Sequence, residues 1–177
     1  MNEIIKAMEE RRSFRKFKPD MLKKEEINQV IEAGLYAPSG RNQQQVIILA
    51  VTNKELRDKL SAINRKIGGW KDENFDPFYG APVVLIVLAH KDYVTYVYDG
   101  SLVMGNMMLA AHSLGLGSCW IHRAKEEFEM DEYKKILTDL GLDEKKYEGI
   151  GHCILGYVEG ERPQALPRKE NRVFWIE

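Results

Sequence analysis

The 177-residue sequence predicts a single domain of α+β or α/β type, in which four strands lie among five helices. Residues 82–89 form a continuous apolar, β-branched run, which is typical of a strand buried on both faces of a sheet. Residues 99–114 contain no proline, and their apolar side chains cover most of a helix circumference, which indicates a helix buried on most sides. The hydrophobic content of 44% is enough for one core.

The first half of the chain shows clear periodic patterns. Residues 2–10 and 24–35 place apolar side chains at helical spacing, and residues 46–51 have the composition of a strand. Residues 54–67 are predicted to be a further helix. The loop 68–80 contains four aromatic residues, which either line a pocket or cap the core.

The helix at residues 99–114 is predicted to run through the middle of the domain and also to contact a second copy of the chain. Asp99 or Ser101 is expected to cap its start, and Gly115 is expected to end it in a left-handed conformation. A chain this short has little material with which to enclose such a helix on every side.

The remaining elements follow this helix. Residues 117–121 and 151–158 are predicted to be strands, and residues 125–140 to be one helix. The segment 159–177 contains two prolines and an apolar end at 173–176. We expect it to be a tail that wraps over the body or over a partner.

Composition excludes several classes of function. Lys and Arg total 26 against 27 Asp and Glu, so the net charge of −1 favours neither nucleic acid nor an anionic membrane as a partner. The sequence shows no secretory signal, and its longest apolar run, 83–89, is too short to span a bilayer, so we expect a cytoplasmic protein. Cys119 and Cys153 have no metal or redox spacing, and the four scattered histidines predict no metal site.

Two basic groups, near the two ends of the chain, are candidates for an anion site. The first consists of Arg11, Arg12 and Arg15 around Ser13, and the second of Arg168 and Lys169. Each group alone has a simple explanation as a solvated charged surface. Arginine forks beside a hydroxyl group nevertheless match a phosphate monoester well, because such hydrogen bonds are charge-assisted and can be bidentate.

Four segments together resemble the nitroreductase family of FMN-dependent oxidoreductases. They are RRSFRKF at 11–17, APSGRNQQ at 37–44, GLGSCWI at 115–121 and LGYVEGERPQALPRKE at 155–170. The segments occur in the family's order and cover nearly the whole chain. The resemblance implies an α+β, nitroreductase-like fold over residues 1–177, with a central mixed β-sheet flanked by helices and a buried central helix at a homodimer interface.

The resemblance also implies a function and a cofactor. The protein would hold FMN, accept hydride from NADH or NADPH and reduce a flat, electron-poor small molecule such as a nitroaromatic or a quinone. No catalytic side chain is expected, because the flavin N5 carries the hydride.

Site residues are carried over by position from the same resemblance. Arg11, Ser13 and Arg15 would hold the FMN phosphate and the pyrimidine edge, with Arg12 contributing through its backbone. A backbone N–H at the Ile121–His122 pair would face the flavin N5. Pro38, Ser39, Gly40 and Asn42 would come from the partner subunit, and Arg168 with Lys169 would close the phosphate site.

Alternative functions stay open at this level. Gln45 and Val46 stand where the family commonly has Pro-Trp, and the loop 68–80 leaves little material for a lid. A flavin-binding module for storage or sensing is therefore an alternative to the enzyme, as is a flavin-fragmenting or dehalogenating activity on the same fold.

Overall fold

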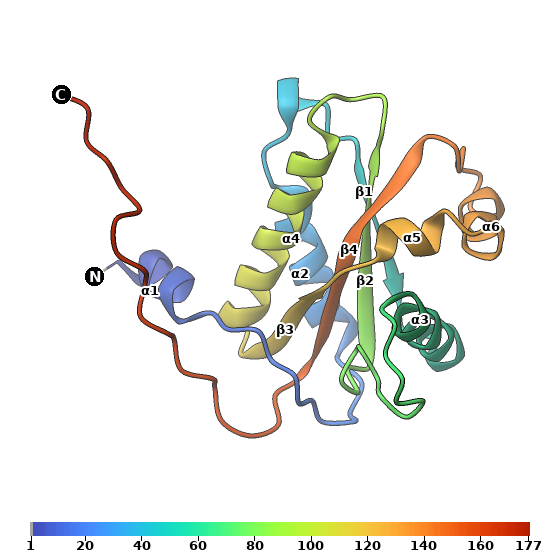
Figure 1. The fold of residues 1–177 in the computed structure, drawn as a ribbon, viewed down its shortest axis with the longest axis horizontal. Helices are drawn as coiled ribbons and strands as arrows, with labels where there is room; N and C mark the ends of the chain where they lie inside the picture. The colour runs from blue at the N-terminus through green and yellow to red at the C-terminus, as the bar shows by residue number, and fades with distance from the viewer. Residues whose placement is uncertain (1) are drawn as a thin grey trace.

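The computed structural model describes residues 2–177, and over that range it contains four β-strands, six α-helices and one 3₁₀ turn (Figure 1). In chain order these are α1 (Glu3–Glu10), α2 (Lys24–Leu35), the 3₁₀ turn (Gly40–Asn42), β1 (Val46–Val51), α3 (Lys54–Ile67), β2 (Val83–His90), α4 (Tyr96–Ser113), β3 (Leu116–Ile121), α5 (Ala124–Phe128), α6 (Asp131–Asp139) and β4 (Tyr147–Tyr157).

The strands form one sheet in the order β1-β2-β4-β3, in which every neighbouring pair is antiparallel. A short parallel bridge between Ser13 and Ser118 extends the sheet beyond β3. Helices α2 and α4 cover one face, and α3, α5 and α6 lie over the other (Figure 1). This arrangement confirms the predicted α+β class, with a central sheet between two layers of helices, but the four strands are antiparallel throughout and do not form the mixed sheet that was expected.

Strand β2 lies at the centre of the core, as its sequence predicts. Its first seven residues are buried, and their side chains alternate between the two apolar clusters on either face of the sheet. A strand with apolar neighbours on both faces needs no polar alternation, and this explains the continuous apolar run.

Helix α4 is the predicted central helix, but its start and the extent of its burial differ from the prediction. It begins at Tyr96, one turn before Asp99, so neither Asp99 nor Ser101 caps it. Gly115 does end it in the left-handed region, at φ 74°. The buried residues form one face and the exposed residues form an opposite stripe, namely Tyr98, Leu102 and Gly105 followed by the half-buried Leu109. The protomer thus covers one side of the helix and leaves the other side uncovered.

The prediction of one continuous helix at 125–140 is wrong, because two helices, α5 and α6, occupy this range. Met130 adopts an extended conformation and separates α5 from α6. The break lets Phe128 and Tyr133 pack into the same apolar cluster from two directions. Strand β4 is also longer than predicted, because its ladder with β2 continues as far as the pairing of Tyr147 with His90.

The tail, residues 159–177, extends past α1 and away from the sheet (Figure 1). Every one of these residues is exposed, and Phe174 and Trp175 are 79% and 85% exposed. Near its start, Glu159 donates its backbone N–H to the Lys16 carbonyl, and Arg162 pairs with Glu10 at 3.4 Å. The tail leaves its own protomer uncovered, and its contact with a partner stays a prediction.

Within residues 2–177, no helix has the length and apolar character needed to cross a membrane.

Candidate functional site

The arginine-rich segment after α1 runs along the edge of the sheet. Ser13 bridges Ser118 of β3, and Phe14 donates its backbone N–H to the Ser118 carbonyl at 3.0 Å. Phe14 and Phe17 are buried, and both pack closely on Gly117, where a side chain would come within 2.9 Å of the Phe17 ring. These two aromatic residues fix the segment on the body.

Arg11 carries the clearest sign of an anion site. Its Nη1 atom is buried and has no hydrogen-bond partner among residues 2–177. In the neighbouring Arg12 guanidinium, Nη1 donates to the carbonyls of Glu9 and Arg11, at 2.6 and 2.5 Å, while the buried Nε also has no partner among these residues. A buried guanidinium donor without an acceptor costs free energy that a bound phosphate oxygen would recover. The residues present therefore fit a phosphate group.

The other groups around Arg11 are mostly cationic. The pKa of His112, at the end of α4, is lowered by burial and by the charges of Arg162, Arg11 and Arg12, although Glu10 acts in the opposite direction. Burial is the largest of these causes and disfavours any charge, so only the three arginine charges favour a bound anion here.

Ser13 and Arg15 lie next to β3, near the buried thiol of Cys119. Burial raises the pKa of this thiol, while the Ser13 hydroxyl and the charges of Arg15 and Arg11 work against the increase. The Arg15 guanidinium also lies over the ring of Tyr79, at 5.8 Å from its centroid. The structure thus brings Arg11, Ser13 and Arg15 to one surface.

Asp99 holds the loop 38–44 in place. Its carboxylate accepts hydrogen bonds from the Gly40 backbone N–H at 3.1 Å, the Gln45 side-chain amide at 2.5 Å and the Thr95 hydroxyl at 2.8 Å. A Cβ atom at Gly40 would lie 2.3 Å from the Thr95 hydroxyl oxygen, so glycine is required there. Asp99 and Gln45 thus hold the predicted site loop, a role that the sequence patterns did not assign to them, although a buried carboxylate in an apolar helix signals a need for partners.

This loop also has an unusual backbone conformation. Arg41, Asn42 and Gln44 have φ values of 54°, 54° and 52°, in the left-handed region that favours glycine. The Ser39 hydroxyl accepts the Gln44 backbone N–H at 3.0 Å, which closes the loop. Pro38 and Ser39 line a cavity of about 140 Å³ with Val103 of α4. Backbone strain of this kind persists where the surroundings over-determine it, and it is concentrated at functional sites.

Within one protomer, the loop and the arginines lie at opposite ends of α4. The loop is bonded to Asp99 and packs on Thr95 at the start of the helix, and the arginines act on His112 at its end. Thirteen residues of helix separate Asp99 from His112, which corresponds to about 20 Å along the axis. One chain therefore does not bring these two groups of predicted residues to the same ligand.

Ile121 and His122 lie at the end of β3, where the chain turns into α5. Both carbonyls accept hydrogen bonds from buried side chains, His152 and Asn64. Arg123 follows with φ 81°, and its guanidinium lies 4.7 Å from the centroid of the Trp70 ring.

The aromatic loop 68–80 lies between Arg15 and Arg123. Trp70, Phe75 and Tyr79 form a row with ring centroids 5.1 and 5.9 Å apart, and Arg123 and Arg15 lie over its two ends. The row thus runs between the arginine segment and the turn after β3. Phe78 of the same loop is fully buried in the core, so it caps the core as the other alternative predicts.

Arg168 and Lys169 lie in the exposed tail. The Arg168 guanidinium donates to the Leu166 carbonyl at 2.7 and 3.3 Å. The structure does not bring this pair into contact with Arg11, so their predicted role at the phosphate stays a prediction.

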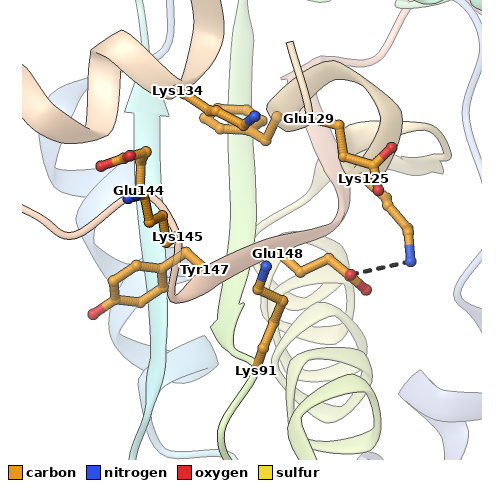
Figure 2. Close-up of a pocket in the computed structure, with 9 residues that line it drawn as sticks. Lys91, Lys125, Glu129, Lys134, Glu144, Lys145, Tyr147 and Glu148 are labelled. Atoms are coloured by element: carbon orange, nitrogen blue, oxygen red, sulfur yellow. Dashed lines mark ion pairs between the residues drawn. The ribbon is translucent and has the colours of Figure 1, made fainter. Parts of the chain in front are cut away.

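A separate cavity of about 210 Å³ lies beside α5 and the start of β4 (Figure 2). Its lysines alternate with acidic side chains, and Lys125 pairs with Glu148 at 3.0 Å. None of the predicted site residues lines it, so we do not assign it to the site.

Comparison with known proteins agrees with this fold. The family model described as "Nitroreductase family" matches residues 8–157. The chain belongs to the nitroreductase family. A nitroreductase with bound FMN from Bacteroides fragilis superposes with a TM-score of 0.87 at 28% sequence identity, over 100% of both chains.

Two curated nitroreductase relatives are 30% identical to this chain and align with 67% of it. One is a putative NADH dehydrogenase/NAD(P)H nitroreductase from Methanothermobacter thermautotrophicus, aligned over 122 residues. The other is an FMN reductase [NAD(P)H] from Bacillus subtilis, aligned over 142 residues. The aligned parts span 60% and 53% of these two proteins.

Proposed function

We propose that this protein is an FMN-dependent oxidoreductase that uses NADH or NADPH to reduce a flat, electron-poor small molecule, such as a nitroaromatic or a quinone. The observation that carries the proposal is the buried, unpartnered Nη1 atom of Arg11 within a group of cations. Membership of the nitroreductase family and the FMN-containing structure with the same fold support the choice of FMN as the anion.

The arginine segment would hold the two ends of the cofactor. Arg11 and the Ser13 hydroxyl would bind the phosphate, and Arg15, which lies over Tyr79, would face the pyrimidine edge of the ring. A fixed cation at that edge stabilises negative charge, so Arg15 would favour the reduced form of the cofactor. Arg12 would have a smaller role, because its guanidinium is already bonded to backbone carbonyls.

When bound, FMN supplies the redox chemistry, in which two reducing equivalents pass from a nicotinamide donor to the acceptor in one pocket. The chain contributes orientation and exclusion of water. The peptide at Ile121–His122 would face the flavin N5, and the aromatic row from Trp70 to Tyr79 would border the pocket. Protons can come from water, so no acid or base side chain is required.

The site would be completed by a second copy of the chain. The loop with Pro38, Ser39, Gly40 and Asn42 is about 20 Å from the arginines along α4, so it would contact the cofactor held by the partner. A two-fold dimer built on the exposed stripe of α4 would form two such sites. The exposed tail would then contact the partner, and its Arg168 and Lys169 would close the phosphate site.

Free flavin is a further candidate for the physiological acceptor. The Bacillus subtilis relative is named as an FMN reductase, and an isoalloxazine ring is itself flat and electron-poor. The same pocket would accept either type of molecule, since both reactions need only a stacked aromatic ring beside the bound cofactor.

The test begins with purified protein and added FMN. We expect a yellow dimer with one FMN per chain, which bleaches rapidly when NADH or NADPH is added without oxygen. Reoxidation by a panel of quinones, nitroaromatics and free flavins would then identify the acceptor class. A colourless protein that takes up no FMN would contradict the proposal. A yellow protein whose FMN is reduced by neither NADH nor NADPH would favour a flavin-binding module.

A further inference from the structure

Three polar side chains meet in the apolar layer between the sheet and α3. Asn64 comes from α3, Glu127 from α5 and His152 from β4, and each is 0% exposed. The Asn64 amide donates to Glu127 Oε1 at 2.7 Å, and His152 Nε2 lies 2.7 Å from Glu127 Oε2. Both carboxylate oxygens of Glu127 are therefore paired.

Two of these side chains, His152 and Asn64, also hold two backbone carbonyls. His152 Nδ1 lies 3.3 Å from the Ile121 carbonyl, and the Asn64 amide also donates to the His122 carbonyl at 2.8 Å. A carbonyl oxygen only accepts, so Nδ1 carries a proton. Since Nε2 faces a carboxyl oxygen, the pair is either an imidazolium with a carboxylate or a neutral imidazole with a carboxylic acid, and its net charge is zero in both cases.

The held segment is the turn from β3 into α5. Arg123 has φ 81°, a left-handed conformation that costs about 1 kcal/mol for a residue with a side chain. On its far side, a Cβ atom at Gly149 of β4 would lie 2.2 Å from the Ala124 carbonyl oxygen. The turn is thus held by hydrogen bonds before Arg123 and by close backbone packing after it.

Stability alone is a weak reason for such a network. Replacing a buried ionic group by apolar side chains of similar volume is often neutral or stabilising, because burial removes the charges from water. The network does something an apolar cluster could not do, since its donors fix the orientation of two successive peptide groups.

We infer that Asn64, Glu127 and His152 are positioning residues, which fix the Ile121–His122 peptide at the angle needed beside the flavin N5. This inference rests on the proposed function. The three side chains act through the backbone and would not touch the cofactor's reactive atom themselves. Correct orientation of reacting groups contributes substantially to catalysis, and a displacement of about 1 Å can lower a rate about 100-fold.

The test uses the holoenzyme and the substitution Asn64→Ser. Serine does not span the distance to the His122 carbonyl, and it leaves room for a water molecule that can solvate Glu127, so the fold should survive. We expect faster amide hydrogen exchange at residues 121–125, a shifted midpoint potential of the bound FMN and an approximately tenfold or larger fall in the rate of its reduction at saturating NADH or NADPH. Affinity for FMN should change little.

Leu137→Ala is the matched control. Leu137 is fully buried in α6, so its truncation should lower the melting temperature without altering the turn or the potential. Unchanged exchange, potential and reduction rate in Asn64→Ser would show that the network is structural and would overturn the inference. A wild-type protein that takes up no FMN would instead overturn the proposed function, so the two failures are distinguishable.

Discussion

Replacement of Arg11 by alanine tests the phosphate site, and the neighbouring Arg12 provides a matched control. Its Nη1 atom is buried without a partner among residues 2–177, so in the free protein the guanidinium has no bond there to lose. In the complex it would make a charge-assisted hydrogen bond to phosphate, worth about 1.5–3 kcal/mol. Since about 1.4 kcal/mol corresponds to a tenfold change, the dissociation constant for FMN should rise about 10- to 150-fold.

The assay is a titration of flavin fluorescence with each variant, using FMN and riboflavin in parallel. Riboflavin lacks the phosphate, so Arg11→Ala should leave its affinity almost unchanged. Arg12→Ala is the control, because Nη1 of that guanidinium is bonded to the carbonyls of Glu9 and Arg11, and we expect a change in FMN affinity of less than about threefold. Thermal unfolding without flavin should show that Arg11→Ala is as stable as the wild type.

Two results would refute this reasoning. Equal, small losses of FMN affinity in both variants would show that the arginines are only part of a solvated charged surface. A loss of riboflavin affinity as large as the loss of FMN affinity would place Arg11 at the ring and not at the phosphate.

Three further predictions concern the interface, the charge and the loop. A Cβ atom at Gly105 meets open space among residues 2–177, so Gly105→Leu should leave the protomer folded but obstruct a partner on α4, and sedimentation should show a monomer with weakened FMN binding. The pKa of His112 is lowered from 6.5, so this residue should reduce stability as the pH falls below 6.5, and NMR titration should show its pKa rising when FMN brings a dianion near Arg11. Burial raises the pKa of Asp76, but hydrogen bonds from Arg57, Ser61 and a backbone N–H outweigh it and lower the pKa. Asp76→Asn should therefore lower the free energy of unfolding by about 2 kcal/mol, as measured by thermal unfolding. The wild type should lose the same stability only when the pH falls through the lowered pKa of Asp76.

Each of these three has an outcome that contradicts it. A dimeric Gly105→Leu protein with full FMN affinity would place the interface elsewhere, and Lys135→Leu on the exposed side of α6 serves as its control. A His112 pKa that is insensitive to FMN would separate the phosphate from this group of cations. An Asp76→Asn protein with wild-type stability would show that the hydrogen bonds of Asp76 do not hold the loop 68–80.

Elements with a strong local pattern could be predicted from the sequence. The bounds of α2, β1 and α3 follow from periodicity alone, because their apolar faces pack against the body along their full length. The break at Met130 was missed because the apolar spacing continues across it. Only the packing of α5 and α6 into one cluster requires a turn there.

The candidate site divides in the same way. Ser13 and Arg15 carry a recognisable local motif, and the structure places them together with Arg11. Asp99 was interpreted as a helix cap because its partners, Gly40 and Gln45, lie more than 50 positions away in the sequence. One sequence gives no indication of such distant pairs. A histidine or a carboxylate within an apolar segment shows only that some partner must exist.

The central claim is that each FMN site combines the arginine segment of one chain with the loop of its partner. It is tested most directly by a mixed dimer of two defective chains, one carrying Arg11→Ala and the other carrying Ser39→Ala with Asn42→Ala. Two different affinity tags isolate this dimer, and bound FMN is measured at a concentration where neither parental dimer binds it. A shared site predicts one FMN per mixed dimer, because one of the two sites then combines an intact arginine segment with an intact loop. A mixed dimer that binds no FMN would contradict the account, since sites contained within single chains would both stay defective.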